Sequence, residues 1–260
     1  MELSVFNYGN YKILYPEFYF QFLKEVFILD VYRTNLVKPS DTVLDLGAGT
    51  GDFSIIASKK VGPQGRVIAV EPNFESYEIL LLNIEQNNCK NVIPLNLAVG
   101  DEELTEKQIT FWGRTFMCKV NTLENIVNSL KIDDDDDKID FIKMDIEGFE
   151  ADVIRKSIGL IKKTGILSIE FHHTKEKIDE LLLPHGFYFE PVTMSYIYKK
   201  IVRNLFLHPL NLSRVYMDTI HKNPHVLRKA VTGFDMTKKG LLIGSYIKRS
   251  DKDICRKIFI

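Results

Sequence analysis

The stretch VLDLGAGTGDFS, residues 43–54, contains a short β-rich run, three glycines at alternate positions and the start of a helical pattern. Gly47, Gly49 and Gly51 permit positive φ and allow a ligand to approach the backbone closely. A second apolar run, RVIAVEP (66–72), follows and stops at Pro72. The order strand, glycine turn, helix, strand predicts parallel strands joined by a crossover helix.

The same alternation continues along the chain. Further strands are expected at 91–100, 139–145, 165–173, 187–192 and 240–250, with helices at 74–88, at 149–158 and from about 178 to Gly186. Pro94 favours an edge position for the strand at 91–100. The last two strands lack a crossover helix of the usual length, so we expect an antiparallel pair. The prediction is an α/β protein with a doubly wound, mostly parallel sheet and an antiparallel C-terminal strand pair.

Two segments differ from this main domain, which we place at 39–260. Residues 1–38 are rich in aromatics, and helical spacing of apolar residues from Pro16 onward predicts a helical cover, which could also be a lid whose tyrosines close over a ligand. An insertion at about 193–239 holds nine basic and two acidic residues between 199 and 239. It is either a solvated cover or a surface for an acidic acceptor or RNA.

The bulk composition excludes several classes. A formal net charge of −1 gives no general attraction to nucleic acid or membranes. The three cysteines are scattered, which argues against a disulfide framework and suits a reducing compartment, so we expect a cytoplasmic protein. No signal peptide and no apolar stretch of bilayer-spanning length is recognised.

The glycine turn and the end of the second strand predict a nucleoside-containing cofactor. Glu71 follows Gly51 by twenty residues, and its carboxylate can accept hydrogen bonds from both hydroxyls of a ribose. Asp52 stands where a dinucleotide pattern requires Gly or Ala, and Asp45 adds negative charge. These carboxylates oppose a diphosphate, and hence a nicotinamide-dependent oxidoreductase, but suit a ligand with an ammonium and a sulfonium group. Alternatively, Asp45 and Asp52 only cap the loop and the helix.

These two motifs resemble the first motifs of class I S-adenosylmethionine-dependent methyltransferases. The stretch IDFIKMDIEGFEADVIR (139–155), together with VNTLENIV (120–127) and LSIEFHH (167–173), is similar to the FkbM-type family. The resemblance covers about residues 36–190 and implies a Rossmann-like seven-stranded domain, S-adenosylmethionine, and methyl transfer to a hydroxyl oxygen of a sugar or natural product. The cofactor is expected to contact Asp45, Gly47, Ala48, Gly49, Gly51, Glu71, Pro72 and Asp145, with Asn96 or Ala98 touching adenine.

The segment FIKMDIEGFE, residues 141–150, places three carboxylates after an apolar strand. Asp145, at the strand end, is expected to face the reaction centre. Glu147 would orient the loop, the acceptor or the cofactor. Glu150 suits a helix N-terminus and needs no catalytic role.

The next strand supplies a partner if it neighbours the first. His172 could then lie beside Asp145 and accept the acceptor's proton as a general base. Alternatively, Asp145, Glu147 and His172 could hold Mg²⁺, which would lower the pKa of the hydroxyl, or His172 could be a structural residue at a strand end. For Glu170, a buried salt bridge with Lys143 is the favoured role.

Missing motifs narrow the reaction further. The loop after Asp145 lacks the Pro-Pro-aromatic sequence that amino methyltransferases acting on bases or glutamine use. No cysteine lies near the predicted site, which argues against the covalent cysteine route to C5 of cytosine. An oxygen acceptor, on a sugar or another small molecule, is therefore the leading hypothesis. An RNA methyltransferase that uses the basic insertion and a non-catalytic S-adenosylmethionine-binding protein are the alternatives.

Overall fold

The computed structural model describes residues 2–103, 105–111, 114–132, 138–207 and 241–248. Its centre is a seven-stranded sheet in the order β11-β12-β10-β9-β3-β4-β5. Strands β3, β4, β5, β9 and β10 run parallel, whereas β12 is antiparallel to both β10 and β11. The strand bounds are β3 Thr42–Leu46, β4 Arg66–Val70, β5 Val92–Leu95, β9 Phe141–Met144, β10 Ile166–His172, β11 Phe187–Pro191 and β12 Leu241–Lys248.

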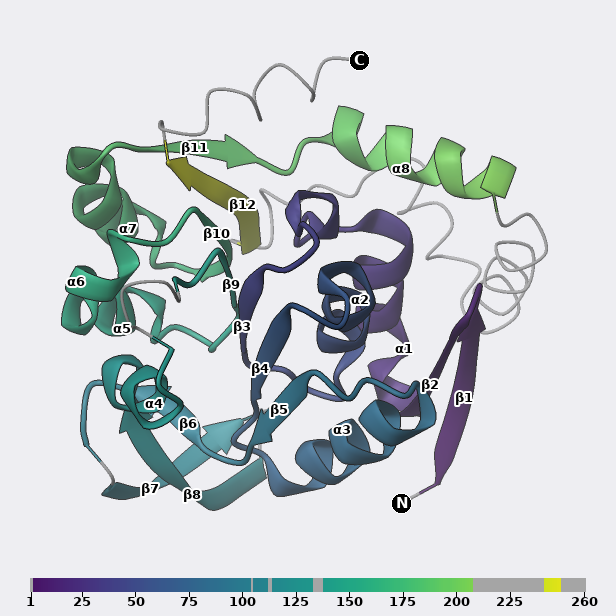
Figure 1. Cartoon of the computed structure of the whole chain (residues 1–260), viewed down its shortest axis with the longest axis horizontal. Helices are drawn as coiled ribbons and strands as arrows, with labels where there is room; N and C mark the ends of the chain where they lie inside the picture. Colours follow the sequence, from purple (N-terminus) through teal and green to yellow (C-terminus); the bar gives the residue numbers. More distant parts are fainter. Residues whose placement is uncertain (1, 104, 112–113, 133–137, 208–240, 249–260) are drawn as a thin grey trace.

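Helices cover both faces of this sheet, as the predicted doubly wound fold requires (Figure 1). One face packs against α2 (Asp52–Val61), α3 (Phe74–Gln86) and the N-terminal segment. The other packs against α4 (Leu123–Ser129), α5 (Glu150–Lys156), α6 (Ile158–Ile161) and α7 (Lys175–Leu182), which is followed by η4 (Leu183–His185). The central strands β3 and β9 are buried along their length because each lies between two apolar layers.

The strand expected at 91–100 is divided between two sheets, so that prediction was wrong in its extent. Its first part is β5, at the edge of the main sheet as Pro94 indicated. Its second part is β6 (Ala98–Gly100), which pairs with β8 (Arg114–Thr122) in a small sheet that also contains β7 (Thr105–Phe111). This small sheet was not predicted, because its strands carry charged and polar residues at most outward positions.

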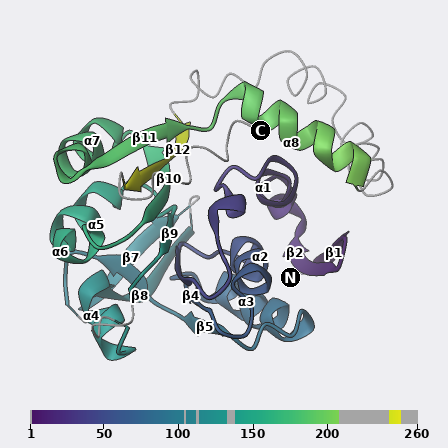
Figure 2. The same cartoon turned by 45° about the horizontal axis from the view of Figure 1, so that its top comes forward.

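The N-terminal segment begins with an antiparallel hairpin of β1 (Leu3–Tyr8) and β2 (Tyr11–Pro16), where no strand was expected. The helical part predicted from Pro16 is present as η1 (Glu17–Tyr19), α1 (Phe20–Leu23) and the π-helix η2 (Lys24–Leu29), followed by η3 (Thr34–Leu36). Helix α8 (Met194–Leu207), the described part of the basic insertion, packs against η2 (Figure 2). The rest of the insertion, 208–239, lies outside the described residues.

Candidate functional site

The candidate site lies at the carboxyl ends of the neighbouring strands β3 and β9. From β3 the chain continues to β4 and β5 on one side of the sheet, whereas from β9 it continues to β10 on the other side. Such a switch point is where ligands bind in open α/β sheets. The loop after β3 has positive φ at Gly47, Gly49 and Gly51. A Cβ on Gly47 would lie 1.9 Å from the carbonyl oxygen of Asp145. Glycine is therefore required there, because the loops after β3 and β9 are in direct contact.

Glu71 connects the end of β4 to the glycine loop. Its carboxylate accepts hydrogen bonds from the backbone N–H groups of Gly49 at 2.7 Å and Asn73 at 2.8 Å. Burial raises the pKa of Glu71 to about 7, although those two hydrogen bonds oppose the shift. The side chain of Asn96 donates to the carbonyl oxygens of Glu71 and Pro72. Asn96, one of the two residues predicted to touch adenine, therefore lies beside the end of β4. Ala98 instead packs in the small sheet, against Cys118 and Val120.

A buried lysine lies among the carboxylates. The Nζ of Lys143 is 3.2 Å from Asp45 Oδ1 and 4.0 Å from Asp145 Oδ2, and it donates a hydrogen bond to the carbonyl oxygen of Gly47 at 2.5 Å. Asp45 is fully buried and also accepts a hydrogen bond from Ser54 Oγ at 2.6 Å. The predicted Lys143–Glu170 salt bridge is therefore wrong, because Lys143 faces the glycine loop instead.

Asp52 begins α2 and is only 5% exposed. Its Oδ1 accepts a hydrogen bond from the backbone N–H of Phe53 at 2.8 Å in the first turn of the helix, whose N-cap residue is Gly51. Burial raises the pKa of Asp52 to about 7, while the Lys143 ammonium opposes the shift. Asp45, Asp52 and Glu71 thus place three buried acidic side chains around the glycine loop. Asp52 and Glu71 are only partly ionised at neutral pH, and a cation bound beside them would favour their charged form.

The structure brings together Asp145, Glu147 and His172, the three residues predicted for the reaction centre. His172 Nε2 lies 3.4 Å from Glu147 Oε2 and 3.9 Å from Asp145 Oδ1. Strand β10 neighbours β9 in parallel, as this prediction assumed. Glu147 reaches His172 because it and Gly148 have φ values of 56° and 101°, which turn the chain sharply after Asp145.

Glu150 has a partner that sequence reasoning missed. Its carboxylate is fully buried and accepts hydrogen bonds from His172 Nδ1 at 2.9 Å, Thr174 Oγ1 at 2.9 Å and the Gly148 N–H at 3.0 Å. Burial alone would lower the pKa of His172, but the hydrogen bond and charge of Glu150, with Glu147 and Asp145, raise it to about 9. Glu150 therefore orients the imidazole and favours its protonated form.

The acidic residues around the glycine loop fit the positive charge of S-adenosylmethionine. The Asp145 carbonyl oxygen and the Tyr19 hydroxyl lie directly against Gly47 and Gly49, and Thr50 Oγ1 is buried in the loop without a hydrogen-bond partner among the described residues. The donor set of Asp145, Glu147 and His172 also has the spacing of a cation site, since one ligand atom of each lies within 4.8 Å of the others. Two carboxylates and one imidazole suit a divalent ion.

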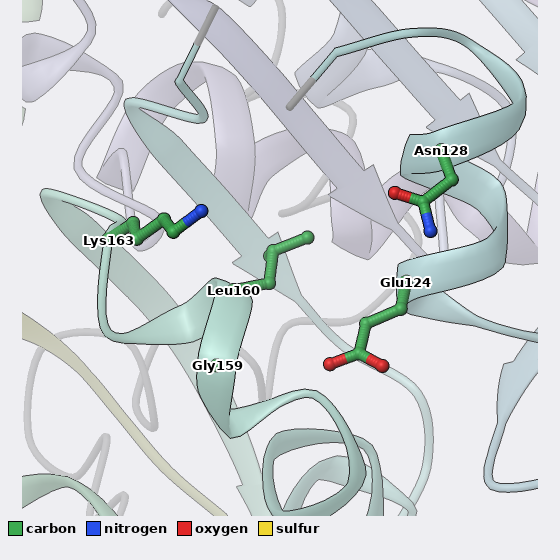
Figure 3. A pocket seen from close by; sticks show the side chains of 5 residues that line it. All are labelled: Glu124, Asn128, Gly159, Leu160 and Lys163. Atoms are coloured by element: carbon green, nitrogen blue, oxygen red, sulfur yellow. The ribbon is translucent and has the colours of Figure 1, made fainter. Parts of the chain in front are cut away.

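A separate hollow of about 300 Å³ lies between α4 and α6 (Figure 3). It is lined by Glu124, Asn128, Gly159, Leu160 and Lys163, none of which belongs to the predicted site. Over the described residues, no helix combines the length and apolar character needed to cross a bilayer.

Comparison with known proteins places the chain among methyltransferases. The profile of the Methyltransferase FkbM domain matches residues 45–193, more than half of the 260 residues. Arsenite methyltransferase from Halobacterium salinarum is 41% identical over 56 residues, which cover 22% of this chain and 14% of that protein. Demethylmenaquinone methyltransferase from Lactobacillus johnsonii is 32% identical over 103 residues, covering 37% of this chain and 42% of that protein. The chain thus matches less than half the length of either relative.

Solved structures include a tRNA m1G37 methyltransferase from M. jannaschii, with a TM-score of 0.44 and 15% identity, covering 74% of this chain and 50% of that one. A SAM-dependent methyltransferase from Aquifex aeolicus has a TM-score of 0.41 and 16% identity, covering 64% of this chain and 84% of that one.

Proposed function

This chain belongs to the Methyltransferase FkbM domain family, and we propose that it methylates a hydroxyl oxygen of a sugar, a glycoconjugate or another small metabolite. The family makes it an S-adenosylmethionine-dependent methyltransferase domain. The observation that supports an oxygen acceptor is the meeting of Asp145, Glu147 and His172 beside the glycine loop. When bound, S-adenosylmethionine supplies an electrophilic methyl group on a sulfonium.

The residues around the glycine loop would hold this cofactor. Glu71 can offer its carboxylate to ribose hydroxyls beside the glycine loop, whose backbone at Gly49 it already contacts. Asp45, Asp52 and Asp145 surround the loop with negative charge, which Lys143 balances only in part. A cofactor carrying a sulfonium and an ammonium gains from this field, whereas a diphosphate is repelled.

The reaction also requires removal of the hydroxyl proton. His172 is the base we propose: its Nδ1 donates to Glu150, so Nε2 is the nitrogen that faces Asp145 and Glu147. Because the pKa of His172 is raised to about 9, only the fraction of molecules with a neutral imidazole can accept the proton at pH 7. The Asp145 carboxylate stabilises the imidazolium that forms.

A divalent cation is the second candidate for this step. The 4.8 Å cluster of ligand atoms on Asp145, Glu147 and His172 favours it. Bound there, Mg²⁺ would displace the proton on Nε2 and lower the pKa of an acceptor hydroxyl. The two routes can be distinguished by the dependence of turnover on added Mg²⁺, because only the metal route requires the ion.

Calorimetry tests the cofactor. We expect one equivalent of S-adenosylhomocysteine to bind and NAD not to bind, each measured with and without Mg²⁺. Glu71→Ala should weaken S-adenosylhomocysteine binding, while His172→Ala should leave it within about twofold. Unchanged affinity in Glu71→Ala would refute the ribose contact. Binding of NAD alone would refute the proposal.

The acceptor is tested separately, by the formation of S-adenosylhomocysteine from S-adenosylmethionine over a panel of methyl glycosides. RNA is the alternative acceptor suggested by the basic insertion, of which Lys199, Lys200 and Arg203 lie in the described helix α8. Transcribed tRNA and ribosomal RNA fragments form the second arm, with a salt-dependent mobility shift as its binding readout. Turnover on RNA but not on any glycoside would overturn the small-molecule proposal. Cofactor binding without turnover in either arm would support a non-catalytic role.

A further inference from the structure

The N-terminal segment 17–36 lies on the candidate site, although the family match begins only at residue 45. Tyr19, at the end of η1, lies against the glycine loop: a Cβ on Gly49 would be 1.9 Å from its hydroxyl oxygen. Tyr32, in the turn between η2 and η3, is 5% exposed and lies deeper. The segment therefore contributes to the active site as well as to the core.

The Tyr32 hydroxyl lies between two carboxylates that belong to neighbouring strands. It is 2.9 Å from Asp145 Oδ2, just after β9, and 2.7 Å from Glu170 Oε2 on β10. The ring is fixed from two sides, by an edge contact with Phe53 at 6.1 Å and by the Lys143 ammonium 4.9 Å from its centroid. Because the phenol has one proton, Tyr32 donates to one of these groups and can accept from the other when that carboxyl is protonated. Tyr32 thus connects the ends of β9 and β10.

The two oxygens of Asp145 have different surroundings as a result. Oδ2 faces the Tyr32 hydroxyl and, at 4.0 Å, the Lys143 ammonium. Oδ1 faces His172 Nε2 at 3.9 Å. A carboxylate held through one oxygen presents the other in a defined direction, and small displacements of reacting groups cost about 10²-fold in rate.

The turn that carries Tyr32 is itself held on both sides. Asp30 accepts hydrogen bonds from the Thr34 N–H at 2.6 Å and from the Tyr196 hydroxyl of α8 at 2.9 Å. Arg33 forms an ion pair with Glu190 of β11 at 2.6 Å. Asp30 and Arg33 both have positive φ, 52° and 55°, so the turn takes this shape against the ordinary backbone preference.

We propose that Tyr32 is a positioning residue for methyl transfer: it holds Asp145 through Oδ2 so that Oδ1 points toward His172 and the acceptor. This inference rests on the proposed function. Tyr32 reaches the site from outside the region that the family profile matches, so it is a feature of this chain's own N-terminal segment.

Tyr32→Phe tests the proposal, with Tyr246→Phe as the matched control. Tyr246 is also fully buried and also donates its hydroxyl to a carboxylate, Asp179 Oδ1 at 2.5 Å, but on the opposite face of the sheet. With the best methyl glycoside of the panel, we expect kcat of Tyr32→Phe to fall at least tenfold, with KM for the glycoside and S-adenosylhomocysteine affinity within about twofold. Equal kcat in the two variants would overturn the proposal.

A second measurement needs no acceptor. In a double-mutant cycle of Tyr32→Phe and Asp145→Leu, followed by urea unfolding, the loss in the double variant should differ from the sum of the single losses, because the two side chains share one interaction. Additive losses would show that Tyr32 does not hold Asp145 and would also overturn the proposal. If no glycoside is turned over, the proposed function fails while this cycle still decides whether Tyr32 holds Asp145.

Discussion

The carboxylate of Glu150 accepts a hydrogen bond from Nδ1 of His172 at 2.9 Å, and the same carboxylate is fully buried. The two residues come from different elements, the first turn of α5 and the end of β10. Because Glu150 also accepts from Thr174 and Gly148, its position is fixed independently of His172. The imidazole is therefore held with Nε2 toward Asp145 and Glu147, the orientation that the proposed role as a base requires.

Turnover should rise with pH, reach half of its maximum near pH 9 and level off only above that value, because the neutral imidazole is the active form and the pKa of His172 is raised to about 9. Glu150→Gln removes the charge that contributes most to the raised pKa of His172. The midpoint of the pH–activity profile should therefore move down toward the ordinary histidine pKa of about 6.5. The pH dependence of kcat and NMR titration of the His172 ring measure the shift independently.

Glu176→Gln provides the control for this shift, since Glu176 is an exposed carboxylate on α7. The pH–activity profile of Glu176→Gln should have the same midpoint as that of the wild type. An inflection near pH 9 in Glu150→Gln would show that Glu150 does not set the protonation of His172. Activity that depends on added Mg²⁺, with no inflection near pH 9, would favour the metal route instead.

Asp52→Asn should stabilise the cofactor-free protein at neutral and alkaline pH. The folded-state pKa of Asp52 is raised by burial to about 7, from an unfolded value near 4. The folded form therefore holds a proton that the unfolded chain releases, so wild-type stability falls as pH rises from about 4 to 7. The advantage of Asp52→Asn should be small at pH 4, grow through pH 7 and then level off.

Thermal unfolding measures this advantage, because about 1 kcal/mol shifts the Tm of a domain of this size by about 2–4 °C. Asp152→Asn is the control: Asp152 also lies in the first turn of a helix, but its side chain is 52% exposed. It should change Tm little at any of these pH values. A pH-independent difference for Asp52→Asn would show that the buried carboxyl group has an ordinary pKa.

Lys143→Met should destabilise the fold strongly. Removing the ammonium leaves the fully buried carboxylate of Asp45 without its cation, and loss of one partner of a buried pair costs about 3–5 kcal/mol. Lys138→Met removes an exposed ion pair with Asp140, for which about 0–1 kcal/mol is expected. Urea unfolding compares the two variants. Adding Asp45→Asn to Lys143→Met should recover part of the loss, and no recovery would contradict the pairing.

The parts of the molecule with strong local periodicity were predictable from the sequence. Strand β3, the glycine loop, α2 and β4 follow from one continuous pattern, and the meeting of Asp145 with His172 follows from the order of neighbouring strands. Glu150 lies at the start of α5 as expected, but its contact with His172 was not predicted, because that contact depends on how the chain turns after β10, where His173 has a φ of 62°. Tyr32 was not singled out because its contacts span more than a hundred residues.

Removing the contacts between α8 and Asp30 should make the turn that carries Tyr32 more mobile. Tyr196→Phe removes the hydroxyl that lies 2.9 Å from Asp30 Oδ2 and 2.7 Å from Asn35 Oδ1, and Lys200→Ala removes the ammonium that pairs with Asp30. Together they should speed amide exchange at Thr34 and Leu36, whose hydrogen bonds close this turn, and lower kcat without changing S-adenosylhomocysteine affinity. Tyr198→Phe, on the exposed side of the same helix, should alter neither. Faster exchange with unchanged kcat would show that the stability of the turn does not affect catalysis. Unchanged exchange would show that α8 does not stabilise the turn.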